Sequence, residues 1–184
     1  MALLVGAFWL GMRLQPSVGP GQAVREVADP VVASLTVRDG AGNRVPLAEP
    51  GSPAVIMISA STCGYCARSL ADIASMSGGR PVSQLRMLTL DGLEHGVRMG
   101  ATAGLTGVWH AEPDGRAAGT MLALNVPGTP VFLLVDSGAV VRRSMPGYPG
   151  REGLAPWVAV MLGDADSIDT SPAGSLLRTP GAPD

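Results

Sequence analysis

An apolar run of strand length, Ala54 to Ala60 (AVIMISA), leads almost directly into two cysteines, Cys63 and Cys66. A continuous apolar run of this length is typical of a strand that is buried on both faces. The residues that follow have helical spacing and predict a helix from Cys63 to Met76 (CGYCARSLADIASM). The sequence therefore predicts a central strand that turns into a helix, with the cysteine pair at the junction.

The flanks of this helix carry residues that are typical of helix ends. Ser61 or Thr62 is available as an N-cap, because a side-chain oxygen there can accept an unpaired N–H of the first turn. Gly78, Gly79 and Pro81 follow the last turn and end the helical pattern. We therefore expect the helix to be defined at both ends.

Turn residues and apolar periodicity divide the rest of the chain into further elements. The predicted order is an N-terminal hairpin followed by β-α-β-α-β-β-α, which defines an α/β fold. The remaining predicted elements are the hairpin strands Ala33 to Arg38 and Arg44 to Leu47, the strand Leu85 to Leu90, a short helix from Gly115 to Leu124, the hairpin strands Val131 to Val135 and Ala139 to Arg143, and a closing helix from Arg151 to Leu162.

Both ends of the chain differ in composition from the part between them. Residues 1–14 open with an apolar run (MALLVGAFWLGM), shorter than the roughly 20 residues of a spanning helix, and indicate a signal peptide or membrane anchor. A buried amphipathic segment is the alternative. Residues 15–30 predict a linker and residues 163–184 a disordered tail, which leaves the domain at 31–162. We expect a periplasmic or other extracytoplasmic location, anchored by the N-terminus.

Charge and residue usage narrow the possible partners. The formal net charge is -2 and the chain has no basic stripe, which argues against nucleic acid as a partner. Every basic residue is Arg, so mechanisms with a Lys nucleophile are excluded. A chain of 184 residues suits a single domain, and we expect a monomer.

Two cysteines separated by two residues at a helix N-terminus are suited to disulfide exchange. The unpaired N–H groups and the dipole of the helix favour the thiolate form of Cys63. In this geometry the first sulfur is exposed and the second lies one turn inward, where it can attack a mixed disulfide. We therefore expect Cys63 to attack and Cys66 to resolve. Gly64 and Tyr65 between them influence the reduction potential.

A zinc site and a structural disulfide are two other interpretations of the pair. Half of a zinc site needs two more ligands, but no third Cys exists, and His95 and His110 lack finger-like spacing. A purely structural bridge is also disfavoured, because so short a loop constrains the unfolded chain little. The two histidines are expected at the surface in loops and receive no role. Trp109, Trp157 and Phe132 are expected to pack in the core.

A second motif lies before the strand at Val131. Pro130 follows Gly128-Thr129 at the start of that strand, where a missing N–H is tolerated. Together with Cys63-Gly64-Tyr65-Cys66, this Gly-Thr-Pro resembles the thioredoxin-like superfamily, in which a cis-proline faces the cysteine pair. The resemblance covers roughly Leu35 to Leu162. It implies a thioredoxin fold, a central mixed sheet flanked by helices, with an N-terminal β-hairpin extension.

The same resemblance implies a role for residues beside the cysteines. Thr129 and Pro130 would face Cys63, and Thr129 would offer its backbone to an extended client segment by strand-like pairing. Gly64, Tyr65, Thr129 and Pro130 are therefore the candidate substrate-binding residues.

Two hints within the superfamily disagree. The N-terminal hairpin and predicted anchor resemble the TlpA/ResA type of membrane-anchored thiol:disulfide interchange proteins, which act outside the cytoplasm, often in cytochrome c maturation. The string from Thr62 to Cys66 (TCGYC) resembles the periplasmic disulfide isomerases. Those isomerases carry a separate dimerisation domain, for which the stretch before Leu35 is too short, so we favour the TlpA/ResA type.

The sequence departs from the pattern at two positions. Thr62 stands where many thioredoxins have Trp, and Met57 stands where they have a buried acid. No proton acceptor for Cys66 is identified, so its proton must leave to water or to an acid elsewhere.

Our leading hypothesis is an enzyme, a thiol:disulfide oxidoreductase without a cofactor or a metal. Its partners are the thiols and disulfides of client proteins and a membrane or soluble thiol reductant. Reduction of clients is the favoured direction. Disulfide isomerase or oxidase activity, and a non-catalytic assembly or metal-binding module, are the alternatives.

Overall fold

The computed structural model describes residues 25–26 and 32–164 of the 184-residue chain. The strands are β1 (Arg25–Glu26), β2 (Thr36–Asp39), β3 (Arg44–Pro46), β4 (Ala54–Ser59), β5 (Leu85–Thr89), β6 (Trp109–Pro113), β7 (Val131–Val135) and β8 (Val141–Pro146). The helices are α1 (Gly64–Ser77), α2 (Leu93–Thr102), α3 (Ala117–Ala123) and α4 (Gly150–Met161), with a 3-10 turn at Val32–Ser34.

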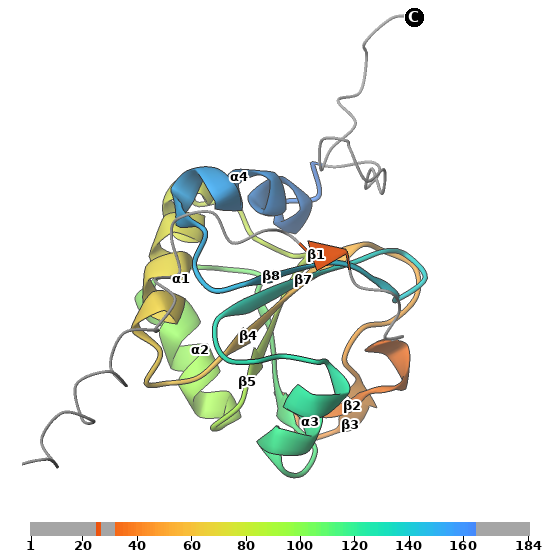
Figure 1. Ribbon diagram of the computed structural model, residues 1–184. Helices are drawn as coiled ribbons and strands as arrows, with labels where there is room; N and C mark the ends of the chain where they lie inside the picture. The colour runs from red at the N-terminus through yellow and green to blue at the C-terminus, as the bar shows by residue number, and fades with distance from the viewer. Residues whose placement is uncertain (1–24, 27–31, 165–184) are drawn as a thin grey trace, which may run out of the picture.

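The strands form one mixed sheet in the order β1-β8-β7-β4-β5-β6-β2-β3 (Figure 1). β4, β5 and β6 run parallel, which requires the crossover connections that α1 and α2 supply. β7 pairs antiparallel with the other side of β4, so β4 has a neighbour on both edges. All six residues of β4 are buried, as its uninterrupted apolar sequence predicts.

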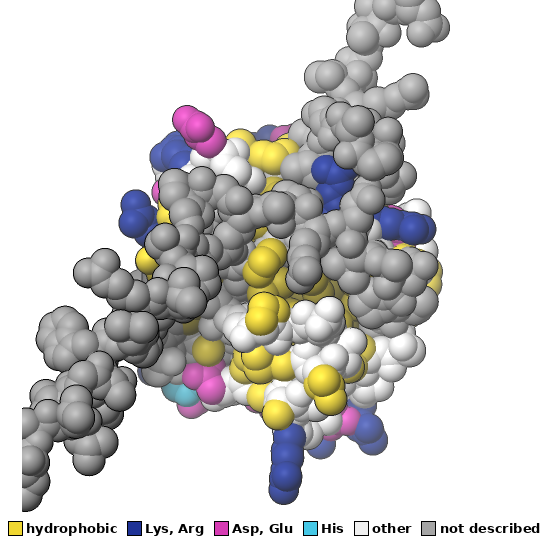
Figure 2. All heavy atoms as spheres, in the orientation of Figure 1, with side chains coloured by type: hydrophobic (Ala, Val, Ile, Leu, Met, Phe, Trp, Pro, Cys, Tyr) yellow, Lys and Arg dark blue, Asp and Glu magenta, His cyan; other side chains and the backbone are white. Residues whose placement is uncertain are grey.

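Two apolar cores lie on opposite faces of this sheet. On one face α1, α2 and α4 cover Val55, Met57 and their neighbours, and this core includes Cys66. On the other face the β2–β3 hairpin, the 3-10 turn and the end of α3 pack on Ile56, Ile58 and their neighbours. Figure 2 shows apolar side chains gathered on the face where α3 lies in Figure 1. Successive residues of β4 thus face the two cores in turn, and Val55 and Met57 share their core with Cys66.

Most elements predicted from the sequence are present, but β1, α2 and β6 were missed. The chain forms helix α2 and strand β6 between β5 and α3, where the sequence indicated loops and a turn at Glu112. α2 contains Gly96 and Gly100, which are poor helix formers, and these glycines are its buried residues. Glycines thus occupy the positions where large apolar side chains would mark the buried side of a helix.

The predicted N-terminal anchor, residues 1–14, lies outside the described residues. Of the predicted linker, Arg25 and Glu26 form β1 and pair with β8, and of the predicted tail only Gly163 and Asp164 are described. Within residues 25–26 and 32–164, no helix has the length and apolarity needed to cross a membrane.

Candidate active site

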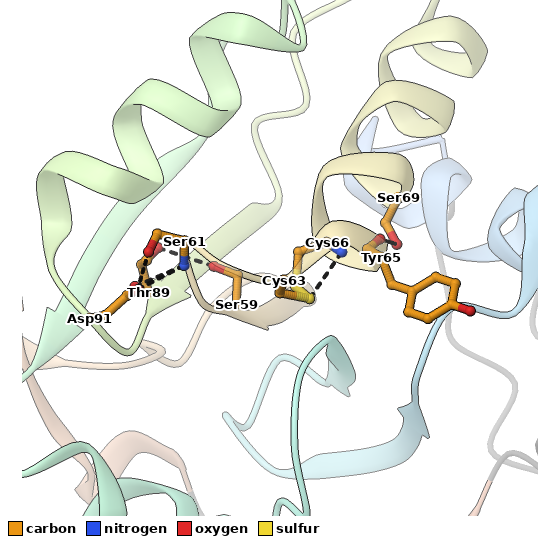
Figure 3. The surroundings of a disulfide bond; sticks show 8 residues. All are labelled: Ser59, Ser61, Cys63, Tyr65, Cys66, Ser69, Thr89 and Asp91. Carbon is orange, nitrogen blue, oxygen red and sulfur yellow. Dashed lines mark hydrogen bonds between the residues drawn. A yellow bond between two sulfur atoms is a disulfide. The ribbon is translucent and has the colours of Figure 1, made fainter.

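Cys63 and Cys66 form a disulfide at the N-terminus of α1, with their Cα atoms 5.2 Å apart (Figure 3). Cys63 is the N-cap of α1, and its Sγ accepts the backbone N–H of Cys66 at 3.1 Å. The prediction that Ser61 or Thr62 caps the helix is therefore wrong. The donor that approaches Cys63 Sγ is one of the unpaired N–H groups that stabilise an anion at a helix N-terminus.

The two sulfurs differ in their exposure. Cys66 is completely buried in the apolar core under the helices, whereas Cys63 is half-buried at its edge. Gly64 and Tyr65 are exposed between them. A partner molecule thus reaches Cys63 before Cys66. Burial among apolar groups disfavours a charged sulfur, and this physical argument applies to Cys66 and not to Cys63 at the edge of the core.

Met57 lies in the same core as Cys66 and is completely buried on β4. Two residues further along β4, the Ser59 hydroxyl pairs with the Thr89 hydroxyl of β5 at 3.1 Å, and both residues are fully buried. Met57, which stands where many thioredoxins have a buried acid, thus places an apolar side chain in this core. The first polar pair on that face is uncharged.

The loop between β4 and α1 is held by Asp91, at the end of β5. Both carboxylate oxygens of Asp91 accept the backbone N–H of Ser61, and the Ser61 hydroxyl donates to the same carboxylate. Desolvation raises the pKa of the exposed Asp91, but the hydrogen bonds from Ser61 outweigh this and leave the pKa below its ordinary value of 3.8. The carboxylate therefore stays charged and keeps the loop before Cys63 in place.

Thr129 and Pro130 lie at the same end of the sheet as the cysteines. Val131 pairs with Ile58, so Pro130 stands next to the last residue of β4, from which the chain continues to Cys63. The Thr129–Pro130 peptide bond is cis, and Pro130 is buried while Thr129 is half-buried. The structure thus brings all six candidate residues (Cys63, Gly64, Tyr65, Cys66, Thr129 and Pro130) to one end of the sheet.

Sequence reasoning missed a third segment at this site, the loop between β8 and α4. The backbone N–H of Gly147 donates to the carbonyl of Pro130 at 2.7 Å, and the Tyr148 ring stacks with the Tyr65 ring. Tyr148 also donates a hydrogen bond to Asp72 and lies under the guanidinium of Arg68. Arg68 and Asp72 follow Tyr65 at helical spacing, but nothing in the sequence connects this face of α1 with Tyr148.

The histidines occupy regular elements, not the surface loops that the sequence predicted. His95 lies in α2 and His110 in β6, where burial lowers the pKa of His110 below its ordinary value of 6.5. Nδ1 of His110 is buried without a hydrogen-bond partner. Across the described part of the chain, no group of three or more His, Cys, Asp or Glu side chains is placed to hold a metal ion.

The aromatic residues expected in the core are divided between the two faces of the sheet. Phe132 and Trp157 are buried and in contact, as predicted. Trp109 is half-buried, and its ring lies under the Arg86 guanidinium, with Cζ 4.9 Å from the ring centroid.

Comparison with known proteins identifies the fold. No protein-family model matches the chain, and no curated protein sequence matches it. Among solved structures, a secreted Mycobacterium tuberculosis disulfide oxidoreductase homologous to E. coli DsbE is similar, with a TM-score of 0.51, 14% identity and coverage of 72% of this chain and 98% of that one. A protein assigned as the thiol:disulfide interchange protein DsbE of Chlorobium tepidum has a TM-score of 0.52 and 20% identity, over 70% of this chain and 92% of that one.

A thioredoxin-like protein from Porphyromonas gingivalis is similar to the same degree. Its TM-score is 0.53 at 19% identity, over 73% of this chain and 93% of that one. The chain therefore has a thioredoxin fold, with the β2–β3 hairpin as an N-terminal extension of the sheet. This fold carries a Cys-x-x-Cys disulfide at the N-terminus of α1.

Proposed function

We propose that this protein is an extracytoplasmic thiol:disulfide oxidoreductase that reduces disulfides in partner proteins. The observation that carries the proposal is the unequal environment of the two cysteines at the N-terminus of α1. Cys63 is accessible and its sulfur accepts a backbone N–H, while Cys66 lies behind it in the core. An accessible thiolate that can be relieved by a buried second thiol is the requirement for disulfide exchange.

The reaction proceeds in two exchanges. In the reduced protein, the Cys63 thiolate attacks one sulfur of a client disulfide, forms a mixed disulfide and releases the other client sulfur as a thiolate. Cys66 then loses its proton and attacks Cys63 Sγ, which releases the second client thiolate and forms the Cys63–Cys66 disulfide. The client gains two electrons and the protein loses two. A membrane or soluble thiol reductant restores the dithiol.

The client is expected to bind across the end of the sheet that holds the cysteines. Gly64 and Tyr65 are exposed beside Cys63, and Thr129 and Pro130 lie where β7 begins next to β4. In this proposal the backbone of Thr129 pairs with an extended client segment, and Pro130 holds that backbone in position.

The proposed setting is outside the cytoplasm, with a monomer attached to the membrane through residues 1–14 and held away from it by the part of the predicted linker that precedes β1. The predicted tail is proposed to begin after Asp164, which pairs with Arg80. The support is the apolar N-terminal sequence, together with the structural likeness to a secreted disulfide oxidoreductase and to a thiol:disulfide interchange protein. Cytochrome c maturation, which requires reduced client cysteines, is the process we propose for a protein of this TlpA/ResA type.

Reduction of insulin or of a disulfide-bonded peptide by the full chain tests the proposal. The wild-type protein, supplied with dithiothreitol, is expected to turn over. Cys63→Ser is expected to abolish the reaction, and Cys66→Ser to stop it at a mixed disulfide that mass spectrometry detects. If Cys63→Ser reduces the substrate as fast as the wild type, the cysteine pair is not the site of reaction.

A redox titration in glutathione or dithiothreitol buffer then gives the direction of electron flow. A reduction potential below about -230 mV is expected for a reductant, and one nearer about -120 mV would identify an oxidase instead. Failure of the pair to form a reversible disulfide would contradict catalysis and favour a non-catalytic assembly or metal-binding role.

A further inference from the structure

Tyr65, between the two cysteines, carries an exposed ring that a second ring holds in place. It is 63% exposed, and its ring is nearly parallel to that of Tyr148, with an interplanar angle of 16° and centroids 6.2 Å apart. Parallel rings at this separation are offset, so each leaves part of its face uncovered. Figure 3 shows the Tyr65 ring directed away from the two sulfurs, so it does not block Cys63.

Tyr148 is itself fixed by two residues of α1. Its hydroxyl donates to the carboxylate of Asp72, and Cζ of Arg68 lies 5.1 Å from the ring centroid. The hydrogen bond to Asp72 raises the pKa of Tyr148, so the phenol keeps its proton and remains a donor. Arg68 and Asp72 lie three and seven residues after Tyr65, on the same side of the helix. One side of α1 thus fixes both rings.

A purely structural role does not explain the exposure of Tyr65. The loop that carries Tyr148 is already connected to the site by the hydrogen bond from Gly147 to the Pro130 carbonyl, at 2.7 Å. Tyr65 contributes little to the core, because most of its surface faces solvent. Fixing an exposed ring removes side-chain freedom without burying it, and this benefits a partner that binds to the fixed ring.

We infer that Tyr65, positioned by Tyr148, is a contact surface that selects clients with an aromatic or large apolar side chain close to the reacting cysteine. This inference rests on the proposed function and specifies its substrate class. The charged groups of Arg68 and Asp72 both contact Tyr148. The exposed ring of Tyr65 is the apolar surface that the client contacts. Tyr65 lies two residues after Cys63 in the chain. An extended client rises about 3.3 Å per residue, so a side chain two residues from the reacting cysteine lies about 7 Å along the client from it, and the test places the aromatic residue there.

The test uses the full chain with Cys66→Ser, so that only Cys63 reacts. Two peptides carry one cysteine each as a mixed disulfide with thionitrobenzoate and differ only in Trp or Gly placed two residues from that cysteine. The Cys63 thiolate attacks the peptide sulfur, the Cys63–peptide disulfide forms, and thionitrobenzoate leaves with the electron pair and is followed by its absorbance. Oxidised glutathione, which has no aromatic group, reports the reactivity of Cys63 itself.

The Trp peptide is expected to react on the order of five-fold faster than the Gly peptide, as a ring-on-ring contact provides. This ratio is expected to fall to about one in Tyr65→Ala and Tyr148→Ala. The rate with oxidised glutathione, measured for each variant, separates any change in the reactivity of Cys63 from the change in the ratio. Tyr148→Phe keeps the ring and is expected to keep the preference. Leu122→Ala, which removes an 84% exposed side chain on α3, is the matched control and is expected to keep it as well.

The possible failures are distinguishable. A Trp-to-Gly ratio near one in the Cys66→Ser protein overturns this inference and leaves the proposed function standing. A ratio that persists in Tyr148→Ala overturns the positioning role of Tyr148. Absence of reaction between Cys63 and every disulfide, oxidised glutathione included, overturns the proposed function and this inference together.

Discussion

The carboxylate of Asp91 accepts the backbone N–H of Ser61 with both oxygens, at 3.0 and 2.9 Å, and also accepts the Ser61 hydroxyl. Asp91 follows β5, which ends at Thr89, and Ser61 begins the turn into α1 after β4. These bonds therefore join the two segments that leave the parallel neighbours β4 and β5. The turn that leads to Cys63 is thus held by Asp91, a residue far from it in the sequence.

Replacing Asp91 with Asn is expected to loosen this turn. The loss is about 1 kcal/mol of unfolding free energy, because the bonds are charge-assisted but open to solvent. The folded pKa of Asp91 is depressed, so its contribution is present above its unfolded pKa and is lost as the pH falls through the folded value. The difference between wild type and Asp91→Asn in urea unfolding should therefore shrink in acid.

Asp164→Asn serves as the control for this prediction, because Asp164 pairs with Arg80 on the exposed surface. An exposed ion pair contributes little, so this variant should unfold close to the wild type. Equal effects of the two substitutions would contradict a specific role for Asp91.

The buried hydroxyl pair of Ser59 and Thr89 predicts a non-additive result. Either Ser59→Ala or Thr89→Val leaves one buried hydroxyl without its partner, at a cost of about 1–3 kcal/mol. The double variant removes both hydroxyls, so it should lose less than the sum of the single variants. Urea unfolding of the four proteins measures the coupling, and strict additivity would show that the pair does not interact.

Gly96 is expected to be intolerant of any side chain. A Cβ there would overlap Oγ1 of Thr89 and stand 3.2 Å from Cβ of the same residue, which is fixed in β5. Gly96→Ala should therefore destabilise the protein by about 1–3 kcal/mol. At Gly119, in helix α3, a Cβ meets nothing within 4 Å, so Gly119→Ala should be neutral or stabilising by up to about 1 kcal/mol. Thermal unfolding of both variants is the measurement.

His110 predicts a loss of stability in mild acid. Burial lowers its pKa in the folded protein, so below about pH 6.5 the unfolded chain binds a proton that the folded chain does not. The free energy of unfolding should fall between about pH 7.5 and about pH 5.5, and His110→Gln should reduce this fall. A slope that is the same in His110→Gln as in the wild type would contradict this role of His110.

The parts of the fold that the sequence predicted are those whose signal is local. β4 and β7 are continuous apolar runs and α1 has helical apolar spacing. Gly78 ends α1 with a φ of 59°, as its position suggests. Helix α2 was missed because it contacts the sheet through Gly96 and Gly100, and a glycine contributes nothing to an apolar pattern. Strand β6 was missed because its pairing with β2 joins segments far apart in the sequence.

The sequence likewise located only those parts of the candidate site that have a local signal. The cysteine pair and the Gly-Thr-Pro motif are short strings. The sequence alone located the first at the start of a helix and the second before a strand. The error at the cap has a physical reason, since Ser61 is engaged by Asp91 and leaves Cys63 to accept the free N–H of the helix. Tyr148 could not be found from the sequence, because the hydrogen bond and the stacking that define its role come from α1, far away in the chain.

The position of the β2–β3 hairpin offers a practical advantage for handling the protein. β3 is the edge strand, four places from β4 in the sheet, which corresponds to about 19 Å at the usual strand spacing. Residues Gly40 to Asn43 of its turn are exposed, while Val37 and Val45 of the hairpin pack in the core on the face of the sheet opposite Cys66. A fluorophore or a bead attached at this turn would leave the reactive end unobstructed, so captured clients could be recovered from an immobilised protein.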